Sequence, residues 1–446
     1  MPSLASDTLS DDLIHLILDY VLDSHGSCLS YGAINQRWRL MVHDHPCFWQ
    51  QHELDNCSSG AINTLTSRIA CARDRPVGIK ISFPSASSAV TIRAVMVIVQ
   101  QHLNHIERLA IDLPWLNSWI ALNSLLIPAP LLKSLTIAIG GHVLSDWTRQ
   151  PDGANVLPWL PKDLFGGWAP KLRVVSLRNI ILDAENTPYW LKEITELSYL
   201  MDSDNWPPLH PGFITPKAIR LTLSVLSVPN FHTPASWGKI QFLELVLLPR
   251  QQLEDVLENL SVQLIPELDG ELKLELCAKN RSAPRIAIFT SLSTGLTRSF
   301  TGTKATWDTL YMAHQHPLKF SQLTTRVVEL RAPPGLLADT ANVLRTKFLA
   351  VQTLGLLLSS GYTRPFTVRY QSFMTDRIDE VALPVLREIV LSSAQATTLS
   401  PTGALRIIQD LPVQHLHQKY PLSLRFDSVS LTEDRYPSDW GACFVL

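Results

Sequence analysis

The sequence has no excess of charge of either sign. Its 446 residues include 38 lysines and arginines against 40 aspartates and glutamates, and charged residues make up only 17% of the chain. A protein that binds nucleic acid or an anionic membrane through charge usually carries a basic patch. No basic run interleaved with aromatic residues occurs here. We therefore expect neither nucleic acid nor a membrane surface as a partner.

The sequence also lacks a long apolar run. The most apolar stretches, IQFLELVLL (240–248) and AVMVIVQ (94–100), are far shorter than the ~20 residues that cross a bilayer. The opening residues MPSLASD (1–7) do not have the basic and apolar regions of a secretory signal. Six cysteines are scattered without a CxxC pair, which favours free thiols over a disulfide framework or a zinc site. An intracellular protein, cytoplasmic or nuclear, is expected.

Signatures of catalysis and cofactor binding are missing as well. The sequence contains no GxxxxGK[ST], GxGxxG, HExxH or GxSxG motif. Candidate metal ligands are poorly spaced: His43, His45, Cys47 and His52, the pair His415 and His417, and the pair Asp202 and Asp204. Pro46 and a helical context break the i, i+2 geometry that a strand would offer to a metal. We expect no enzyme, no cofactor and no metal, while an unrecognised α/β enzyme whose site assembles in space stays an open alternative.

What the chain does contain is an unusually apolar first helix. Ser10 stands at the expected cap, and Asp11 and Asp12 put negative charge in the first turn. One apolar face follows helical spacing and a second row lies beside it: Leu13, Leu16, Ile17, Tyr20 and Val21, then Ile14, Leu18 and Leu22. A helix with so much apolar circumference must be buried against something.

Two more helices are predicted next to it. The second covers 29–42, with Ile34, Trp38 and Met41 on one face, and a short third helix carries Phe48 and Trp49. Three short helices cannot easily bury this apolar surface alone. The partner is either another polypeptide or the rest of this chain.

These residues resemble an F-box. The order Leu-x-Asp-Asp-Leu-x-x-x-Ile-Leu (9–18), then Arg-Trp-Arg-x-x-Val-x-x-x-Pro-x-x-Trp (37–49), is similar to that family, although Ser10 replaces a usual proline and Asn35 a frequent cysteine. The resemblance implies a three-helix module, here residues 5–54, that docks on the Skp adaptor and through it reaches a cullin. The residues that would supply its packing or the adaptor contact are Leu9, Leu13, Ile14, Ile17, Ile34, Trp38, Val42 and Trp49. Alternatively, residues 9–54 are only a helical cap on the domain that follows.

Residues 55–100 form a predicted helix-strand linker region that packs on the first repeats. A helical pattern over 61–72 leads to the alternating strand VGIKISF (77–83). An F-box followed by this order resembles F-box proteins of mushroom-type fungi.

From residue 101 to 446 a short unit recurs, apolar-x-x-apolar-x-apolar. Its clearest copies are Ile106/Leu109/Ile111, Leu132/Leu135/Ile137, Leu172/Val175/Leu177, Ile194/Leu197/Tyr199, Ile240/Leu243/Leu245, Val351/Leu354/Leu356 and Leu386/Ile389/Leu391. Helix-compatible segments lie between some copies, at 250–264 and 336–351. Strand plus helix at this period is typical of leucine-rich repeats, whose units stack because none covers its own apolar face. The predicted fold class is thus α/β, a short F-box-like module followed by a degenerate leucine-rich-repeat-like solenoid, with another α/β layering as the alternative.

In this arrangement the triads point inward and the residues between them face the concave side. Thr136, Ser176, Thr222, Glu244, Lys273 and Glu329 are the predicted target-binding residues. The asparagine that usually follows the strand is missing at the expected offset, for instance at Ile180 and Asp202. Residues 265–320 suggest a hairpin insertion, and residues 151–170 a long loop.

The function implied is that of a substrate-recognition subunit of an SCF-type ubiquitin ligase, in which the F-box binds the adaptor and the repeats bind a target protein. A repeat-type interaction scaffold without a ubiquitin role is the alternative.

Overall fold

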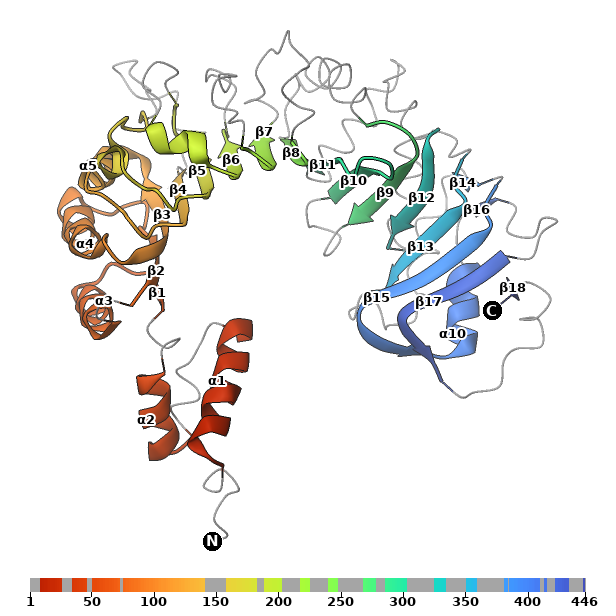
Figure 1. Ribbon diagram of the computed structural model, residues 1–446, viewed down its shortest axis with the longest axis horizontal. Coiled ribbons are helices and arrows are strands. Elements are labelled where there is room, and N and C mark those ends of the chain that lie inside the picture. Colours follow the sequence, from red (N-terminus) through yellow and green to blue (C-terminus); the bar gives the residue numbers. More distant parts are fainter. Residues whose placement is uncertain are drawn as a thin grey trace. The chain divides into compact units, whose positions relative to one another are not determined.

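The computed structural model describes residues 9–25, 34–45, 50–72, 75–140, 158–182, 188–202, 217–224, 240–247, 268–277, 285–302, 325–333, 350–358, 381–383, 385–409, 413–414, 422–432 and 444–445. The chain divides into two compact units, Met1–Ala218 and Ile219–Leu446. Both are built around parallel strands, so the class is mixed α/β (Figure 1).

The first unit opens with two helices, α1 (Asp11–His25) and α2 (Gln36–Asp44). Ser10 Oγ accepts a hydrogen bond from the backbone N–H of Leu13 at 3.3 Å, which is the predicted cap. Asn35 caps α2 by accepting from the N–H of Trp38 at 2.8 Å. Ile34 and Asn35 therefore precede this helix, which was expected to include them, because the asparagine side chain replaces the backbone carbonyl that would have continued it.

The structure changes one boundary of the predicted module and leaves its third helix untested. The third helix of the module was predicted around Phe48 and Trp49, and residues 46–49 lie outside the described residues. Strand β1 (Gln51–Leu54) pairs in parallel with β2 (Val77–Ser82), so residues assigned to the helical module belong to the sheet. The described part of the module consists of two helices.

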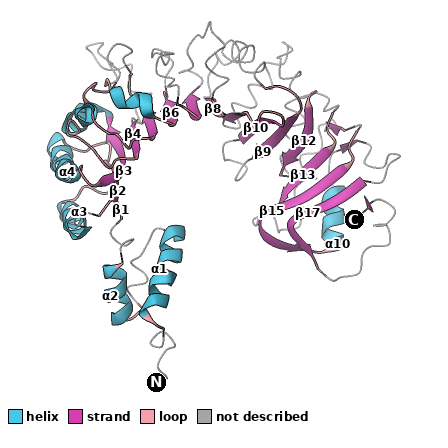
Figure 2. Cartoon of the chain, in the orientation of Figure 1, coloured by secondary structure: helices cyan, strands magenta, loops and turns pink. Residues whose placement is uncertain are grey.

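The rest of the first unit alternates strands with helices. After β1 come α3 (Ser59–Ala72), β2, α4 (Ala89–His102), β3 (Ile106–Pro114), the 3-10 turn η4 (Trp115–Asn117), α5 (Ser118–Ser124) and β4 (Ser134–Gly140). The 3-10 turns η6 (Leu164–Gly167) and η7 (Tyr189–Glu193) then precede β5 (Val174–Arg178) and β6 (Glu196–Leu200). Helices α3, α4 and α5 line one face of the strands (Figure 2). Residues 55–100, predicted as a linker region, are thus strand-helix units of the same kind as those that follow.

Each strand of this unit pairs in parallel with the next one along the chain, and the register aligns the predicted triads. One buried row joins Leu109, Leu135, Val175 and Leu197, and a second joins Ile111, Ile137, Leu177 and Tyr199. Between these rows, on the other face, Ala110, Thr136, Ser176 and Ser198 are in register. The alternation of the sequence therefore becomes an apolar inner face and a small, polar outer face.

The second unit contains a ten-stranded sheet among its described residues. Its strands are β7 (Arg220–Ser224), β8 (Phe242–Leu247), β9 (Leu272–Cys277), β10 (Arg285–Ser291), β11 (Thr297–Gly302), β12 (Val327–Ala332), β13 (Thr353–Leu358), β15 (Glu388–Leu399), β17 (Leu422–Leu431) and β18 (Phe444–Val445). The spatial order is β7-β8-β11-β10-β9-β12-β13-β15-β17-β18. A separate pair, β14 (Val381–Ala382) and β16 (Val413–Gln414), and helix α10 (Pro401–Gln409) complete it.

Strands β9, β10 and β11 form an antiparallel meander inserted into this otherwise parallel sheet. β10 pairs antiparallel with both neighbours, while β11 is parallel to β8 and β9 is parallel to β12. Short connections allow antiparallel pairing where no helix crosses over. The insertion predicted within 265–320 is confirmed as three strands.

The predictions for three other segments have different outcomes in the structure. The helix expected at 250–264 lies outside the described residues, and so does the helix expected at 336–351 except for its last two residues, which are not helical. The segment 151–170 is more than a loop where it is described, because Trp159 bridges Ile181 and the turn η6 buries Leu164 and Phe165. No helix in the described part of the chain is long and apolar enough to cross a membrane.

Candidate protein-interaction site

Helices α1 and α2 form a small core of their own. Ile14 and Leu18 of α1 pack with Trp38 and Val42 of α2, and all four are buried. Leu9 and Met41 border this cluster. The second apolar row of α1 is therefore the one that holds the helix pair together.

Polar contacts fix how the two helices meet. Arg37 forms an ion pair with Asp11 in the first turn of α1, and its Nη2 also donates to the carbonyl of Leu9 at 2.7 Å. The rings of His15 and His45 stack with their centroids 5.3 Å apart. The contacts of Arg37 join the start of α1 to α2. The histidine stack joins α1 to His45, the C-terminal cap residue of α2.

The other apolar row of α1 faces solvent. Leu13 is 48% exposed, Leu16 64%, Ile17 36% and Tyr20 80%. Their spacing of three and four residues places them on one side of the helix, about a third of a turn from the buried row. We call these four residues the α1 stripe. Ile34, which precedes the cap of α2, and Leu40, within α2, are also exposed.

The structure divides the residues predicted for the adaptor contact into two groups. Leu13, Ile17 and Ile34 are exposed, whereas Ile14, Trp38 and Val42 pack inside the helix pair and Leu9 is half-buried. Trp49 lies outside the described residues. Leu16 and Tyr20 were missing from the predicted contact although they share the helical spacing of Leu13 and Ile17. That spacing was the signal that could have found them.

The predicted target-binding residues all lie half-buried on strands. In the first unit Thr136 of β4 and Ser176 of β5 are direct neighbours. In the second unit Thr222 neighbours Glu244, and Lys273 neighbours Glu329. The structure thus places the six residues in three separate pairs, and each pair lies on the outer face of two neighbouring strands.

The outer face of the second unit is held by ion pairs and hydroxyl contacts. Glu244 accepts hydrogen bonds from Thr222 Oγ1 at 3.4 Å and Thr301 Oγ1 at 2.7 Å. Glu329 lies 3.9 Å from Lys273 Nζ and 2.5 Å from Arg331 Nε. Partly exposed pairs of this kind contribute on the order of 1 kcal/mol or less each. These polar groups are therefore hydrogen-bonded or ion-paired with one another across neighbouring strands.

The described residues that were weighed as metal ligands have structural neighbours instead. His45 stacks on His15, and His52 is buried on β1. Asp202 forms an ion pair with Arg178 at 3.0 Å. Cys47, Asp204, His415 and His417 lie outside the described residues. Among the described residues, no three or more His, Cys, Asp or Glu side chains gather in a way that could hold a metal ion.

Comparison with known proteins adds no assignment. No protein-family model matches the chain, and no curated protein matches it.

Proposed function

We propose that the chain is a substrate-recognition subunit of an SCF-type ubiquitin ligase, with the α1–α2 pair as an F-box-like module that binds the Skp adaptor. The observation that supports this is the division of α1 into two apolar rows. One row packs on α2, and the α1 stripe stays exposed on a helix pair that already has its own core. Exposed apolar side chains in a contiguous stripe indicate a protein partner.

The mechanism would be one of proximity. The adaptor links the helix pair to the cullin, a target protein binds the strand-rich body of the chain, and ubiquitin is transferred to a lysine of the target. Binding both partners to one chain raises their effective concentration. No reactive group of this chain is required.

The adaptor contact is tested by substitution on the stripe. Purified full-length protein is mixed with the Skp adaptor, and the complex is measured by gel filtration and calorimetry. Leu16→Asp should abolish binding, because it places a charge in the centre of the stripe while leaving the buried row intact. The matched control is Leu116→Asp in the turn η4, since Leu116 is also exposed, at 69%, and does not belong to the helix pair.

The result separates the two functions. Binding by the wild type and Leu116→Asp but not by Leu16→Asp supports the ligase subunit. If the wild type does not bind the adaptor, the chain is a protein-interaction scaffold without a ubiquitin role. Trp38→Asp is a poor variant for this test, because Trp38 belongs to the core and its loss would unfold the helix pair.

A further inference from the structure

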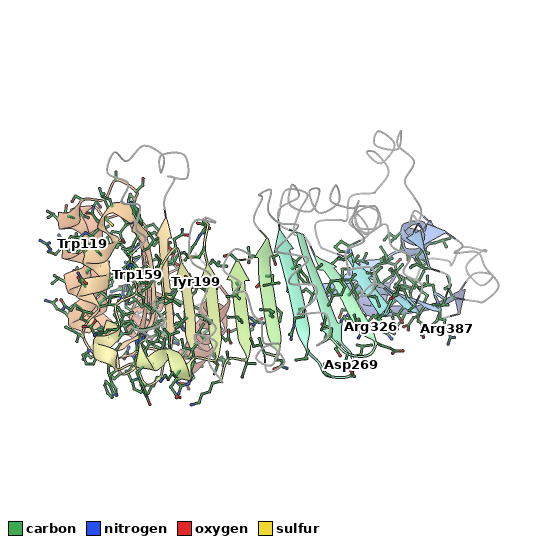
Figure 3. The ribbon with its side chains drawn as sticks, turned by 90° about the horizontal axis from the view of Figure 1, so that it is seen from above. Trp119, Trp159, Tyr199, Asp269, Arg326 and Arg387 are labelled. Carbon is green, nitrogen blue, oxygen red and sulfur yellow. The ribbon has the colours of Figure 1, made fainter. Side chains whose placement is uncertain are left out.

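A groove of about 390 Å³ lies in the second unit where strands β9, β12, β13 and β15 begin. These four strands are neighbours in this order and run parallel, so the residues that precede them lie along one edge of the sheet. Arg326 and Arg387 both line the groove (Figure 3). Its lining does not include Glu244, Lys273 or Glu329.

Arg326 is held in place by backbone carbonyls. Its Nε and Nη2 donate to the carbonyl of Gly270 at 2.9 and 2.7 Å, and Nη2 also donates to that of Leu268. Its Nη1 makes no hydrogen bond to any described residue. A guanidinium fixed on one edge, with donors left on the other, is preorganised for a carboxylate.

Arg387 supplies the second positive charge. Its backbone joins β13 and β17 through the carbonyl of Gln352 and the N–H of Ser423, while its exposed side chain forms no ion pair or hydrogen bond with the described part of the chain. Glu271 is the one carboxylate among the lining residues. The wall of the groove therefore carries an excess of one positive charge, and the rest of it includes the apolar side chains of Val328, Ala350 and Val385.

The spacing of the two arginines defines the ligand. Arg326 precedes β12 and Arg387 precedes β15, with β13 between them. Two strand spacings separate the backbones of the two arginines by about 10 Å. This is also about the length of one three-residue turn of a polyproline II helix, in which side chains three residues apart lie on the same face. We propose that the groove binds an acidic segment of a partner protein in the polyproline II conformation, in which two carboxylates three residues apart contact Arg326 and Arg387 and aliphatic side chains between them pack on Val328 and Val385. This site does not require adaptor binding by the α1 stripe, so each proposal is tested separately.

The probe is a fluorescein-labelled peptide with two glutamates separated by two leucines in a glycine-serine background, added to the full-length protein. Binding is followed by fluorescence anisotropy. Arg387→Gln should weaken binding about fivefold, as the loss of one partly exposed charge contact predicts. Glu271→Gln should strengthen it by a factor of about two to three, because it removes the opposing charge. Arg108→Gln removes an exposed arginine from β3 and should leave the affinity unchanged.

Two peptide controls establish that the spacing matters. A peptide with adjacent glutamates keeps the charge and loses the spacing, and a peptide with both glutamates replaced by glutamine keeps the leucines and loses the charge. Both should bind at least about fivefold more weakly. The proposal is overturned if the two acidic peptides bind alike, if Arg108→Gln weakens binding as much as Arg387→Gln does, or if Glu271→Gln has no effect.

Discussion

Asn179 and Asp202 exchange two hydrogen bonds across the neighbouring strands β5 and β6. Asn179 Nδ2 donates to Asp202 Oδ2 at 2.8 Å, and the backbone N–H of Asp202 donates to Asn179 Oδ1 at 2.9 Å. The same Nδ2 also donates to the carbonyl of Ile139, at the end of β4, at 2.8 Å. One buried amide thus joins the ends of three successive strands of the first unit.

Asn179→Ala should lower the free energy of unfolding of the first unit by about 2–3 kcal/mol. The substitution leaves the buried Ile139 carbonyl without its donor, and it puts alanine at a φ of 57°, which asparagine tolerates better. Urea denaturation followed by tryptophan fluorescence measures the change. Lys133→Ala, which removes an exposed ion pair with Glu107, is the control and should cost less than about 1 kcal/mol. Equal losses for the two variants would contradict the role assigned to Asn179.

This asparagine also shows where the sequence was informative and where it was not. The leucine-rich pattern expects its asparagine at position 180, where isoleucine stands, whereas the buried asparagine of the structure is the preceding residue, Asn179, with a left-handed backbone. The inward triads and the inserted antiparallel strands were predictable, because alternation and short turns act locally.

The helix pair shows a second limit of sequence reasoning. Helical spacing identified both apolar rows of α1, but it does not indicate which of the two rows is buried. That choice depends on Trp38 and Val42 of α2, which pack on Ile14 and Leu18. The groove lined by Arg326 and Arg387 was not predictable at all, since its lining residues come from four segments spread over more than a hundred positions, which only the sheet order brings together.

Truncating a side chain should lower the stability of the helix pair much more in the buried row of α1 than in the α1 stripe. Ile14→Ala should destabilise the helix pair by about 2–4 kcal/mol, because it removes buried methyl groups from a small core. Leu13→Ala should change its stability by less than about 0.5 kcal/mol, since surface substitutions rarely cost more. Hydrogen exchange of the α1 backbone amides reports both effects. Rapid exchange in Leu13→Ala would show that the stripe, too, packs inside the chain.

Tyr199 should make the first unit less stable in alkali. Burial raises the pKa of its phenol to about 12, against an opposing hydrogen bond with the backbone of Leu182. An unfolded tyrosine ionises near pH 10, so the folded state holds its proton more tightly. The stabilisation is fully present below about pH 10, and up to about 2–3 kcal/mol is lost as the pH rises to about 12.

Tyr199→Phe tests this dependence. The variant should show a smaller loss of stability between pH 10 and 12 when urea midpoints are compared with those of the wild type. Tyr189→Phe serves as the control, because Tyr189 is exposed and its ionisation costs the fold little. A Tyr199→Phe curve that falls as steeply as the wild type would assign the alkaline loss to other groups.

Arg298 is a charged residue of the second unit that stands in an apolar row. It is 1% exposed and lies in register between Leu243 and Phe289. Its Nη1 donates to the carbonyls of Ile240 and Thr297, both at 3.0 Å.

Arg298→Ala should destabilise the unit by about 3–5 kcal/mol, since it opens a cavity and leaves the Ile240 carbonyl without this donor. Arg298→Met fills the space without a charge and should recover half or more of that loss, because an apolar side chain of similar length avoids the desolvation of the guanidinium. Denaturation midpoints of the two variants decide between the contributions, and a Met variant as unstable as the Ala variant would show that the hydrogen bonds of Arg298, and not its volume, hold β8 and β11 together.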